Sequence, residues 1–288
     1  MNLTVGDRQI GPGHPCFIIA EVGLAHDGSL SAAHAYIDAA ASAGVDAVKF
    51  QCHLGDPVSE WRVPPDWSRD IDRQEYWKRT GFPDEEWARL ELHCIQAGVE
   101  FLCSPFSVEA VKLIDPYVRL WKVPSGKVTD MALLKAIGQT NKPVLLSTGM
   151  GTETECSNAY LNLVNWGSQV LLLHCISMYP CPPQSLGLDV LTDLNANYES
   201  FYAGLSDHSG TIYPGIAAAA LGCQVLEVHV CFSKEQGGFD TAASLDMGQL
   251  RQLVEGVRFV EKAMQPVDKD ALAERLSETR RVFMGATA

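Results

Sequence analysis

Short apolar segments rich in β-branched residues alternate along the chain with longer segments of helical pattern. Residues 17–23, "FIIAEVG", and 170–177, "VLLLHCIS", are nearly continuous apolar runs. Such runs are typical of parallel strands that are covered on both faces. The pattern predicts eight strands, at 17–23, 47–51, 100–106, 120–126, 143–150, 170–177, 202–208 and 225–230.

Helical patterns fall between and after these strands. Eight strands that each lead into a helix fit a closed (β/α)8 barrel. The alternative is a doubly wound open sheet, which carries a glycine-rich phosphate loop after its first strand, and "EVGLAHDG" lacks the GxGxxG spacing. We therefore predict an α/β fold with a single (β/α)8 TIM barrel over residues 1–265, followed by a C-terminal helix and tail over 266–288. The clearest helices are predicted at 29–43, 84–97, 130–139, 213–221 and 246–263.

A long irregular segment, residues 52–83, separates the second strand from its helix. Loops of this length in a compact domain are usually functional. Because the segment follows the carboxyl end of a strand, we expect it to form a lid over the barrel mouth.

Composition narrows the class of protein. The 288 residues include 47% hydrophobic and 20% charged residues with a net charge of −13, and one α/β barrel commonly uses this length. The acidic balance argues against a nucleic-acid partner, which requires a basic face. The first residues lack a secretory signal, and no apolar run is long enough to span a membrane. We expect a cytoplasmic protein whose nine cysteines, which form no CxxC pair, stay reduced.

Polar side chains gather at the carboxyl ends of the predicted strands, where (β/α)8 barrels carry out chemistry. Side chains alternate along a strand, so residues two apart share a face. A barrel with a purely structural interior would scatter its polar residues over both ends. The residues that share this end are Glu21, Lys49, Gln51, Ser104, Lys122, Ser147, Cys175, Ser177, Ser206, His208, Glu227 and His229.

Two histidines in this set suggest a metal site. His208 and His229 lie 21 residues apart, which is one βα unit, so they should occupy the same end of neighbouring strands. Two imidazoles held in this way suit a divalent ion that keeps open positions for water and substrate. Asp207, Glu227 and Glu21 could orient them or supply a ligand oxygen. With few histidines and many carboxylates nearby, a Mn or Mg type of ion is favoured over a closed structural zinc site.

Two lysines, Lys49 and Lys122, accompany the histidines. Ammonium groups together with hydroxyls and loop N–H groups form a cradle for phosphate or carboxylate. Alternatives for either lysine are a Schiff base, as in a class I aldolase, or an internal ion pair. A metal beside an anion pocket indicates a substrate with both a carbonyl and a phosphate. The hydroxyls interleaved with the lysines belong to Ser104, Ser125, Ser147, Ser177 and Ser206.

The motifs resemble those of the N-acetylneuraminate (sialic acid) synthase family, over residues 17–264. The matching segments are "FIIAEVGLAHDGSL", "AGVDAVKFQ", "FLCSPF", "WKVPSGKVTDMALLKAIGQTNKPVLLSTGM", "LLHCISMYP", "GLSDHSG" and "ALGCQVLEVHV", in the family's order. The resemblance implies a metal-dependent condensation of phosphoenolpyruvate with an open-chain aldose, which gives a 2-keto-3-deoxy sugar acid and phosphate with C–O cleavage. The implied ion is Mn, with Mg or Co as alternatives.

The resemblance also implies roles for individual residues. His208 and His229 resemble the metal ligands, and Glu21, Lys49 and Lys122 complete the implied catalytic set. The residues that resemble phosphoenolpyruvate contacts are Lys49, Ser104, Lys122, Ser125, Ser147, Ser177 and Ser206. The residues that resemble contacts to the acceptor sugar and the reacting centre are Glu21, Gln51, Tyr179 and Asp240.

The acceptor side departs from the family pattern. The segment "GLAHDG" stands where the family has Gly-Ile-Asn-His-Asn-Gly, and "GGFDTAASL" keeps Asp240 but has Phe239 where the family has proline. The chain ends about where the family's linker to a C-terminal domain begins, so we expect the barrel domain only, with an altered acceptor. A lysine Schiff-base aldolase, a non-catalytic sugar-binding barrel, a homodimer through barrel faces and a separate C-terminal domain acting in trans are left open.

Overall fold

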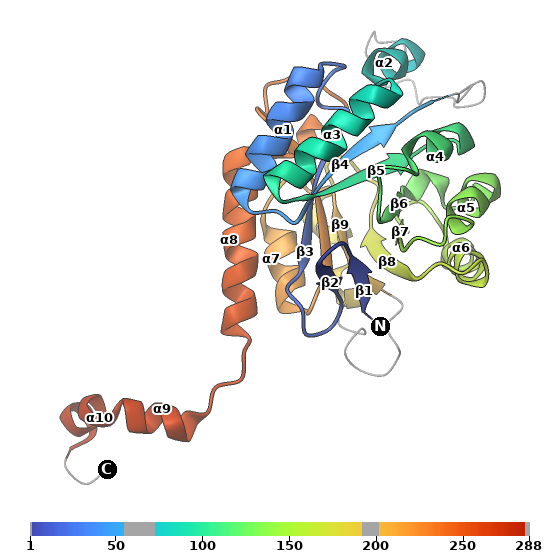
Figure 1. Ribbon diagram of the computed structural model, residues 1–288. Helices are drawn as coiled ribbons and strands as arrows, with labels where there is room; N and C mark the ends of the chain where they lie inside the picture. The colour runs from blue at the N-terminus through green and yellow to red at the C-terminus, as the bar shows by residue number, and fades with distance from the viewer. Residues whose placement is uncertain (1, 55–72, 192–201, 286–288) are drawn as a thin grey trace.

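The computed structural model describes residues 2–54, 73–191 and 202–285, and its centre is a barrel of eight parallel strands (Figure 1). Neighbouring strands pair in the order β5-β4-β3-β10-β9-β8-β7-β6, and the two end strands of this order, β5 and β6, also contact each other. The predicted (β/α)8 barrel is therefore confirmed. Its strands are β3 (Phe17–Gly23), β4 (Ala47–Cys52), β5 (Glu100–Pro105), β6 (Trp121–Val123), β7 (Val144–Ser147), β8 (Val170–Cys175), β9 (Tyr202–Asp207) and β10 (Val225–Cys231).

The register of the barrel strands brings polar residues of neighbouring strands level with one another. Glu21 of β3 lies opposite both Lys49 of β4 and His229 of β10. Where β9 pairs with β10, Ser206 lies opposite Glu227. Because all these strands run in one direction, their carboxyl ends share one mouth of the barrel.

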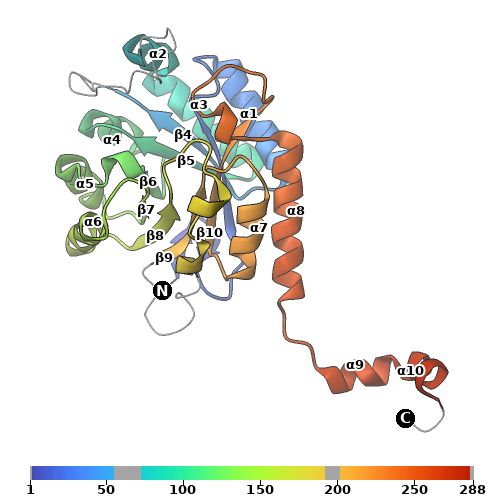
Figure 2. The same ribbon diagram turned by 180° about the vertical axis from the view of Figure 1, so that it is seen from behind.

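Helices cover the outside of the barrel (Figures 1 and 2). Several begin with a side-chain cap: Ser29 accepts from the N–H of Ala32, and Thr152 and Glu155 form a capping box. The cap at Ser29 agrees with the helix start predicted there. The covering helices are α1 (Leu30–Ala43), α3 (Asp84–Ala97), α4 (Val108–Ile114), α5 (Met131–Gly138), α6 (Glu153–Asn165), α7 (Tyr213–Ala220) and α8 (Met247–Ala263).

A short N-terminal hairpin closes the end of the barrel opposite the mouth. It consists of β1 (Leu3–Val5) and β2 (Arg8–Ile10), which pair antiparallel. Its apolar side chains join one buried cluster with strand residues such as Phe17, Leu102 and Leu145. The barrel interior is therefore apolar towards the hairpin and polar towards the mouth.

The segment between β4 and α3 contains a helix that its sequence pattern did not indicate. Residues 73–80 form α2 (Arg73–Thr80), whereas the whole of 52–83 was predicted to be irregular. Residues 55–72 of the expected lid lie outside the described part of the chain. Strand β6 is also shorter than predicted, because Pro124 lacks an N–H and the next residues turn into η2 (Ser125–Lys127).

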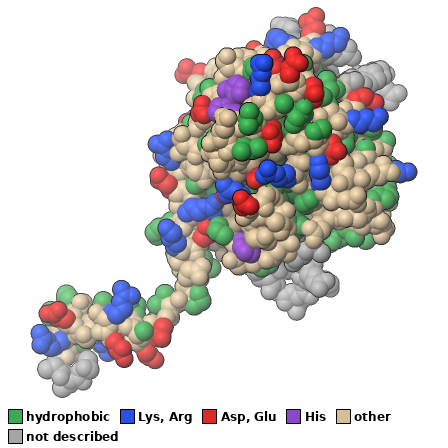
Figure 3. All heavy atoms as spheres, in the orientation of Figure 1, with side chains coloured by type: hydrophobic (Ala, Val, Ile, Leu, Met, Phe, Trp, Pro, Cys, Tyr) green, Lys and Arg blue, Asp and Glu red, His purple; other side chains and the backbone are tan. Residues whose placement is uncertain are grey.

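Two helices, α9 (Lys269–Arg275) and α10 (Ser277–Met284), follow the barrel where the pattern indicated one. The break falls at Leu276, whose φ of −94° and ψ of 12° leave the helical region. None of their side chains is buried, and both lie away from the barrel with charges of both signs on their surface (Figure 3). Among the described residues, no helix is long and apolar enough to cross a membrane.

A buried histidine beside the mouth makes stability depend on pH. His26 is 1% exposed and stacks on Phe82 with ring centroids 4.6 Å apart, and burial lowers its pKa to about 4. Its pKa in the unfolded chain is about 6.5, so the native state binds fewer protons between these values. Stability should be full above pH about 6.5 and fall by about 3 kcal/mol as the pH drops to about 4. Urea unfolding of the wild type and His26→Phe over this range should show a smaller loss in the variant; equal losses would contradict the assignment.

Candidate active site

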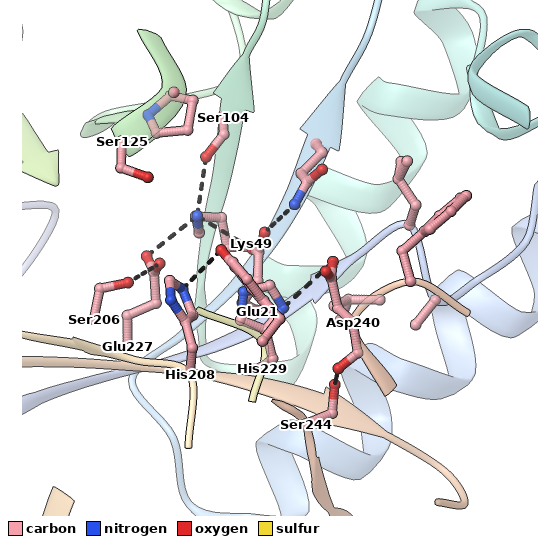
Figure 4. Close-up of a pocket in the computed structure, with 18 of the residues that line it drawn as sticks. Glu21, Lys49, Ser104, Ser125, Ser206, His208, Glu227, His229, Asp240 and Ser244 are labelled. Carbon is pink, nitrogen blue, oxygen red and sulfur yellow. Dashed lines mark hydrogen bonds and ion pairs between the residues drawn. The ribbon is translucent and has the colours of Figure 1, made fainter. Parts of the chain in front are cut away.

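A cavity of about 490 Å³ opens at the carboxyl ends of the barrel strands (Figure 4). The strand ends bring the sequence-predicted site residues together there, with the exceptions of Asp207 and of Ser177, which lies just behind the wall. The predicted residues that line the cavity are Glu21, Lys49, Gln51, Ser104, Lys122, Ser125, Ser147, Cys175, Tyr179, Ser206, His208, Glu227, His229 and Asp240.

Two lysines and two carboxylates form a buried ion-pair cluster at the base of this cavity. Lys49 Nζ lies 3.3 Å from Glu21 Oε2 and 3.2 Å from Glu227 Oε2. Lys122 Nζ lies 3.2 Å from Glu227 Oε1. Each of these four residues is at most 2% exposed, so all three ion pairs are withdrawn from water. The internal ion pair that the sequence left open for the lysines is present in the structure.

The cluster changes the proton affinity of its members. Burial alone lowers the pKa of Lys49, but Glu21 and Glu227 outweigh it and the pKa lies above its usual value. Burial keeps the pKa of Lys122 below its usual value despite the attraction of Glu227. For Glu227, burial raises the pKa, but Lys122 and Lys49 reverse the effect and hold this carboxyl ionised. Lys49 and Glu227 therefore carry fixed charges at neutral pH.

Hydroxyl groups surround the ion pairs. Lys49 Nζ donates to Ser104 Oγ at 2.9 Å, and Ser206 Oγ donates to Glu227 Oε1 at 2.9 Å. Ser177 Oγ lies 2.8 Å from Ser125 Oγ, so it supports the wall from behind. Among the described residues, no hydrogen-bond partner faces the buried hydroxyl of Ser147. A buried donor without a partner suits a site that receives an anionic oxygen from a ligand.

The two predicted metal ligands lie side by side at the cavity wall. The ring centroids of His208 and His229 are 5.2 Å apart. His208 Nδ1 donates to the carbonyl of Ile176 at 2.9 Å, which leaves Nε2 as an acceptor, 3.0 Å from the hydroxyl of Tyr179. Burial, aided by His229, lowers the pKa of His208 to about 3. Its imidazole is therefore neutral at physiological pH, as a metal ligand must be.

These donors fit an open metal site rather than a closed one. In the described part of the chain, no group of three or more His, Cys, Asp or Glu is arranged to hold a metal. The pair supplies two imidazole nitrogens, and Asp240 Oδ2 lies 3.7 Å from His229 Nδ1. An ion bound here would take its remaining ligands from water and substrate, and would compete with Tyr179 for His208 Nε2.

The outer wall of the cavity is largely aromatic. The His53 ring stacks between Trp77, with centroids 4.7 Å apart, and Phe106, at 3.8 Å. Tyr76 meets Phe239 edge to face at 5.2 Å. On the polar side of the same region, Gln51 Nε2 donates to Glu21 Oε1 at 2.8 Å.

Sequence reasoning missed several residues that line this cavity, among them His53 and Lys127, and it missed one ion-pair contact. The pairing of Glu227 with the lysines was missed, although its parity with His229 placed it inside the barrel. His53 was missed although it continues the series of Lys49 and Gln51. Lys127, which also lines the cavity, left no signal in the strand pattern. Asp207, which was expected to orient the histidines or supply a ligand oxygen, lies outside the lining of the cavity, and its carboxylate accepts hydrogen bonds from Ser209 N and Oγ, at 3.0 and 2.8 Å.

Fold and site together define a class of protein: a TIM-barrel enzyme whose strand ends hold an ion-pair cluster, hydroxyls and a histidine pair around one cavity. The family model named NeuB family matches residues 36–269. The chain belongs to this family, and it is an enzyme of the sugar acid synthase class. The resemblance found in its motifs is thereby confirmed.

Individual relatives agree with this assignment. The N,N'-diacetyllegionaminic acid synthase of Campylobacter jejuni is 32% identical over 265 residues, which cover 86% of this chain and 77% of that protein. The N-acetylneuraminate-9-phosphate synthase of Homo sapiens is 30% identical, over 92% of this chain and 76% of that protein. A sialic acid synthetase of Leptospira borgpetersenii, solved with citrate, superposes with a TM-score of 0.82 at 28% identity, over 99% of this chain and 98% of that chain.

Proposed function

We propose that this enzyme condenses phosphoenolpyruvate with an open-chain aldose to give a 2-keto-3-deoxy sugar acid and inorganic phosphate. The observation that carries the proposal is the cluster of Lys49, Lys122, Glu21 and Glu227, ringed by hydroxyls and adjacent to a histidine pair. Ammonium and hydroxyl donors suit the phosphate and carboxylate of phosphoenolpyruvate. The relatives named above make sugar acids of this kind, which supports the same class of reaction here.

The proposed reaction forms one C–C bond and breaks one C–O bond. C3 of phosphoenolpyruvate attacks the aldehyde carbon, and the aldehyde oxygen becomes a hydroxyl by taking up a proton. Water adds to the electron-poor C2, and collapse of that tetrahedral carbon expels phosphate and leaves the 2-keto group. Glu21 is placed to orient or deprotonate this water, because its carboxylate reaches the cavity and is held by Lys49 and Gln51.

His208 and His229 are the proposed ligands of a divalent ion, with Mn favoured over Mg or Co. The chemistry that such an ion supplies when bound is Lewis-acid polarisation of the aldehyde oxygen. Tyr179 and Asp240 contact the histidines directly and face the same cavity. We assign these two residues and Gln51 to the acceptor side.

The acceptor is proposed to differ from N-acetylmannosamine. The aromatic wall of His53, Trp77, Phe106 and Phe239 borders the region in which the acceptor would lie. Apolar faces of this kind favour a sugar with an equally apolar face over a fully hydroxylated one. Efficient turnover of N-acetylmannosamine by this chain would contradict the altered acceptor.

The test is phosphate release from phosphoenolpyruvate with Mn²⁺ across a panel of N-acetylated and plain aldoses, each repeated with a chelator. We expect release with one acceptor and its loss on chelation, with recovery when Mn²⁺ is restored. Release that survives chelation would contradict the metal. Trapping of pyruvate by borohydride would point instead to the Schiff-base aldolase, and failure to bind phosphoenolpyruvate would overturn the proposed function.

A further inference from the structure

A second pair of histidines lies on the outside of the barrel, where α1 packs beside α3. Its members are His34 of α1 and His93 of α3, and Figure 3 shows a patch of histidine side chains over these two helices. The two Nδ1 atoms lie 2.6 Å apart, and the ring centroids lie 4.7 Å apart. Neither residue lines the active-site cavity, so the proposed reaction does not account for this pair.

Asp38 orients the ring of His93. It lies one helical turn after His34 on α1, and its Oδ1 is 2.8 Å from His93 Nε2. A carboxylate can only accept, so the neutral ring of His93 carries its proton on Nε2 and presents the lone pair of Nδ1 to His34. Histidines that bind metal ions are commonly oriented in this way, with a carboxylate on the far ring nitrogen. The lone pair of His93 therefore has a fixed direction, towards a point between the two rings.

His34 can direct a lone pair to the same point. In the ion-free pair, a proton on His34 Nδ1 is donated to His93 Nδ1, because two facing lone pairs would repel each other. Burial and the neighbouring His93 lower the pKa of His34, so its ring is neutral at physiological pH. A neutral imidazole carries its proton on either nitrogen. When the proton of His34 moves to Nε2, both Nδ1 atoms are ready to bind a cation, and no proton has to be released.

The surroundings of the pair leave room for an ion and its water molecules. The two histidines border a shallow surface cavity of about 340 Å³, which is lined by His34, Arg89, Leu92, His93 and Gln96. Zn–N bonds of about 2.0–2.1 Å in a tetrahedral site place two nitrogens about 3.3 Å apart, so each ring needs to move by only a few tenths of an ångström. The charge of Arg89 opposes a cation, but Arg89 is exposed and its field is screened by water, and the carboxylate of Asp38 offsets it.

We propose that His34 and His93 form a second divalent-metal site, separate from the barrel mouth, that takes an ion of the Zn²⁺ or Cu²⁺ kind. Imidazole nitrogens suit these ions, whereas Mn²⁺ and Mg²⁺ prefer oxygen ligands. The ion links α1 to α3 through the two Nδ1 atoms, and water completes its coordination. Because it binds the folded protein, it stabilises the barrel wall at this place. The inference goes beyond the proposed function and does not depend on it.

The test titrates Zn²⁺ into metal-stripped protein by calorimetry. The wild type should show a binding event that weakens about 100-fold or more in His34→Ala and in His93→Ala, because each change removes one of the two nitrogen ligands. The same event should persist in His229→Ala, which affects only the histidine pair at the mouth. Asp38→Asn should weaken it about 10- to 100-fold, the usual cost of losing the carboxylate behind a ligating histidine.

His14→Ala is the matched control, because His14 is an exposed histidine beside the N-terminal hairpin, and it should bind Zn²⁺ as the wild type does. Circular dichroism without metal checks that each variant is folded. An event that keeps its affinity in both His34→Ala and His93→Ala, or that is lost in His229→Ala, would place the ion elsewhere and overturn the inference. A wild type that binds no Zn²⁺ would also overturn it. None of these outcomes bears on the condensation of phosphoenolpyruvate, which is tested by phosphate release.

Discussion

Glu227→Gln should destabilise the barrel by about 3–5 kcal/mol, the usual cost of removing one partner of a buried ion pair. Glu227 forms ion pairs with two ammonium groups, those of Lys122 and Lys49, each at 3.2 Å. Without Glu227, only Lys49 would keep a carboxylate partner, Glu21. Lys122 would be left buried without an opposite charge, and displacement of the lysines by about 1 Å would reduce condensation about 100-fold or more. Urea unfolding and phosphate release measure the two effects.

The pH dependence of the stability loss in Glu227→Gln should show that the lost charge causes it. Lys122 and Lys49 hold the pKa of Glu227 below its usual value, so the stabilisation is present above the unfolded pKa of about 4.3 and is lost as the pH falls further. The stability difference between wild type and Glu227→Gln should therefore shrink between pH 7 and pH 3. A difference that stays constant over this range would assign the loss to packing. Glu255→Gln, on the exposed face of α8, serves as the matched control and should change neither property.

The barrel could be predicted because its elements carry their own signals. Strand β8 is a nearly continuous apolar run, and α1 follows a serine that caps it. The N-terminal hairpin could not be predicted, because its three-residue strands are too short to show a period. Helix α2 was missed because its sequence, "RQEYWKRT", has no apolar stripe. The break between α9 and α10 was missed for a related reason: no side chain of either helix is buried, so tertiary packing leaves no pattern there.

The cavity could be predicted only as far as strand parity allows. Parity placed Lys49, Ser206, His208 and His229 inside the barrel, and the structure brings them to one cavity. The same rule, applied strictly, would have turned Asp207 outward, since it lies between two inward residues. Parity could not show that Glu227 pairs with lysines from β4 and β6, because those contacts cross the barrel interior and depend on strand register. Nor could it detect Lys127, which lies on a turn beyond a strand end.

His229→Ala should weaken Mn²⁺ binding about 100-fold or more, because it removes one of the two proposed nitrogen ligands; loss even of an outer partner commonly costs 10- to 100-fold. Asp240→Asn should weaken Mn²⁺ binding only about 10- to 100-fold. Asp240 Oδ2 lies 3.7 Å from His229 Nδ1, so this carboxylate acts on the ion through His229. Mn²⁺ titration by electron paramagnetic resonance measures the affinity, and phosphate release at saturating Mn²⁺ measures what each change does to turnover.

His14→Ala is the matched control, because His14 is exposed at the end of the barrel that carries the N-terminal hairpin and hydrogen-bonds Asn2. It should leave Mn²⁺ affinity and turnover unchanged. Saturating Mn²⁺ should restore more activity to Asp240→Asn than to His229→Ala, because Asp240→Asn keeps both imidazoles. His229→Ala that binds Mn²⁺ as tightly as the wild type would place the ion elsewhere. Normal turnover in both variants would instead mean that the histidine pair binds no catalytic ion, and that the lysine cluster alone activates the substrates.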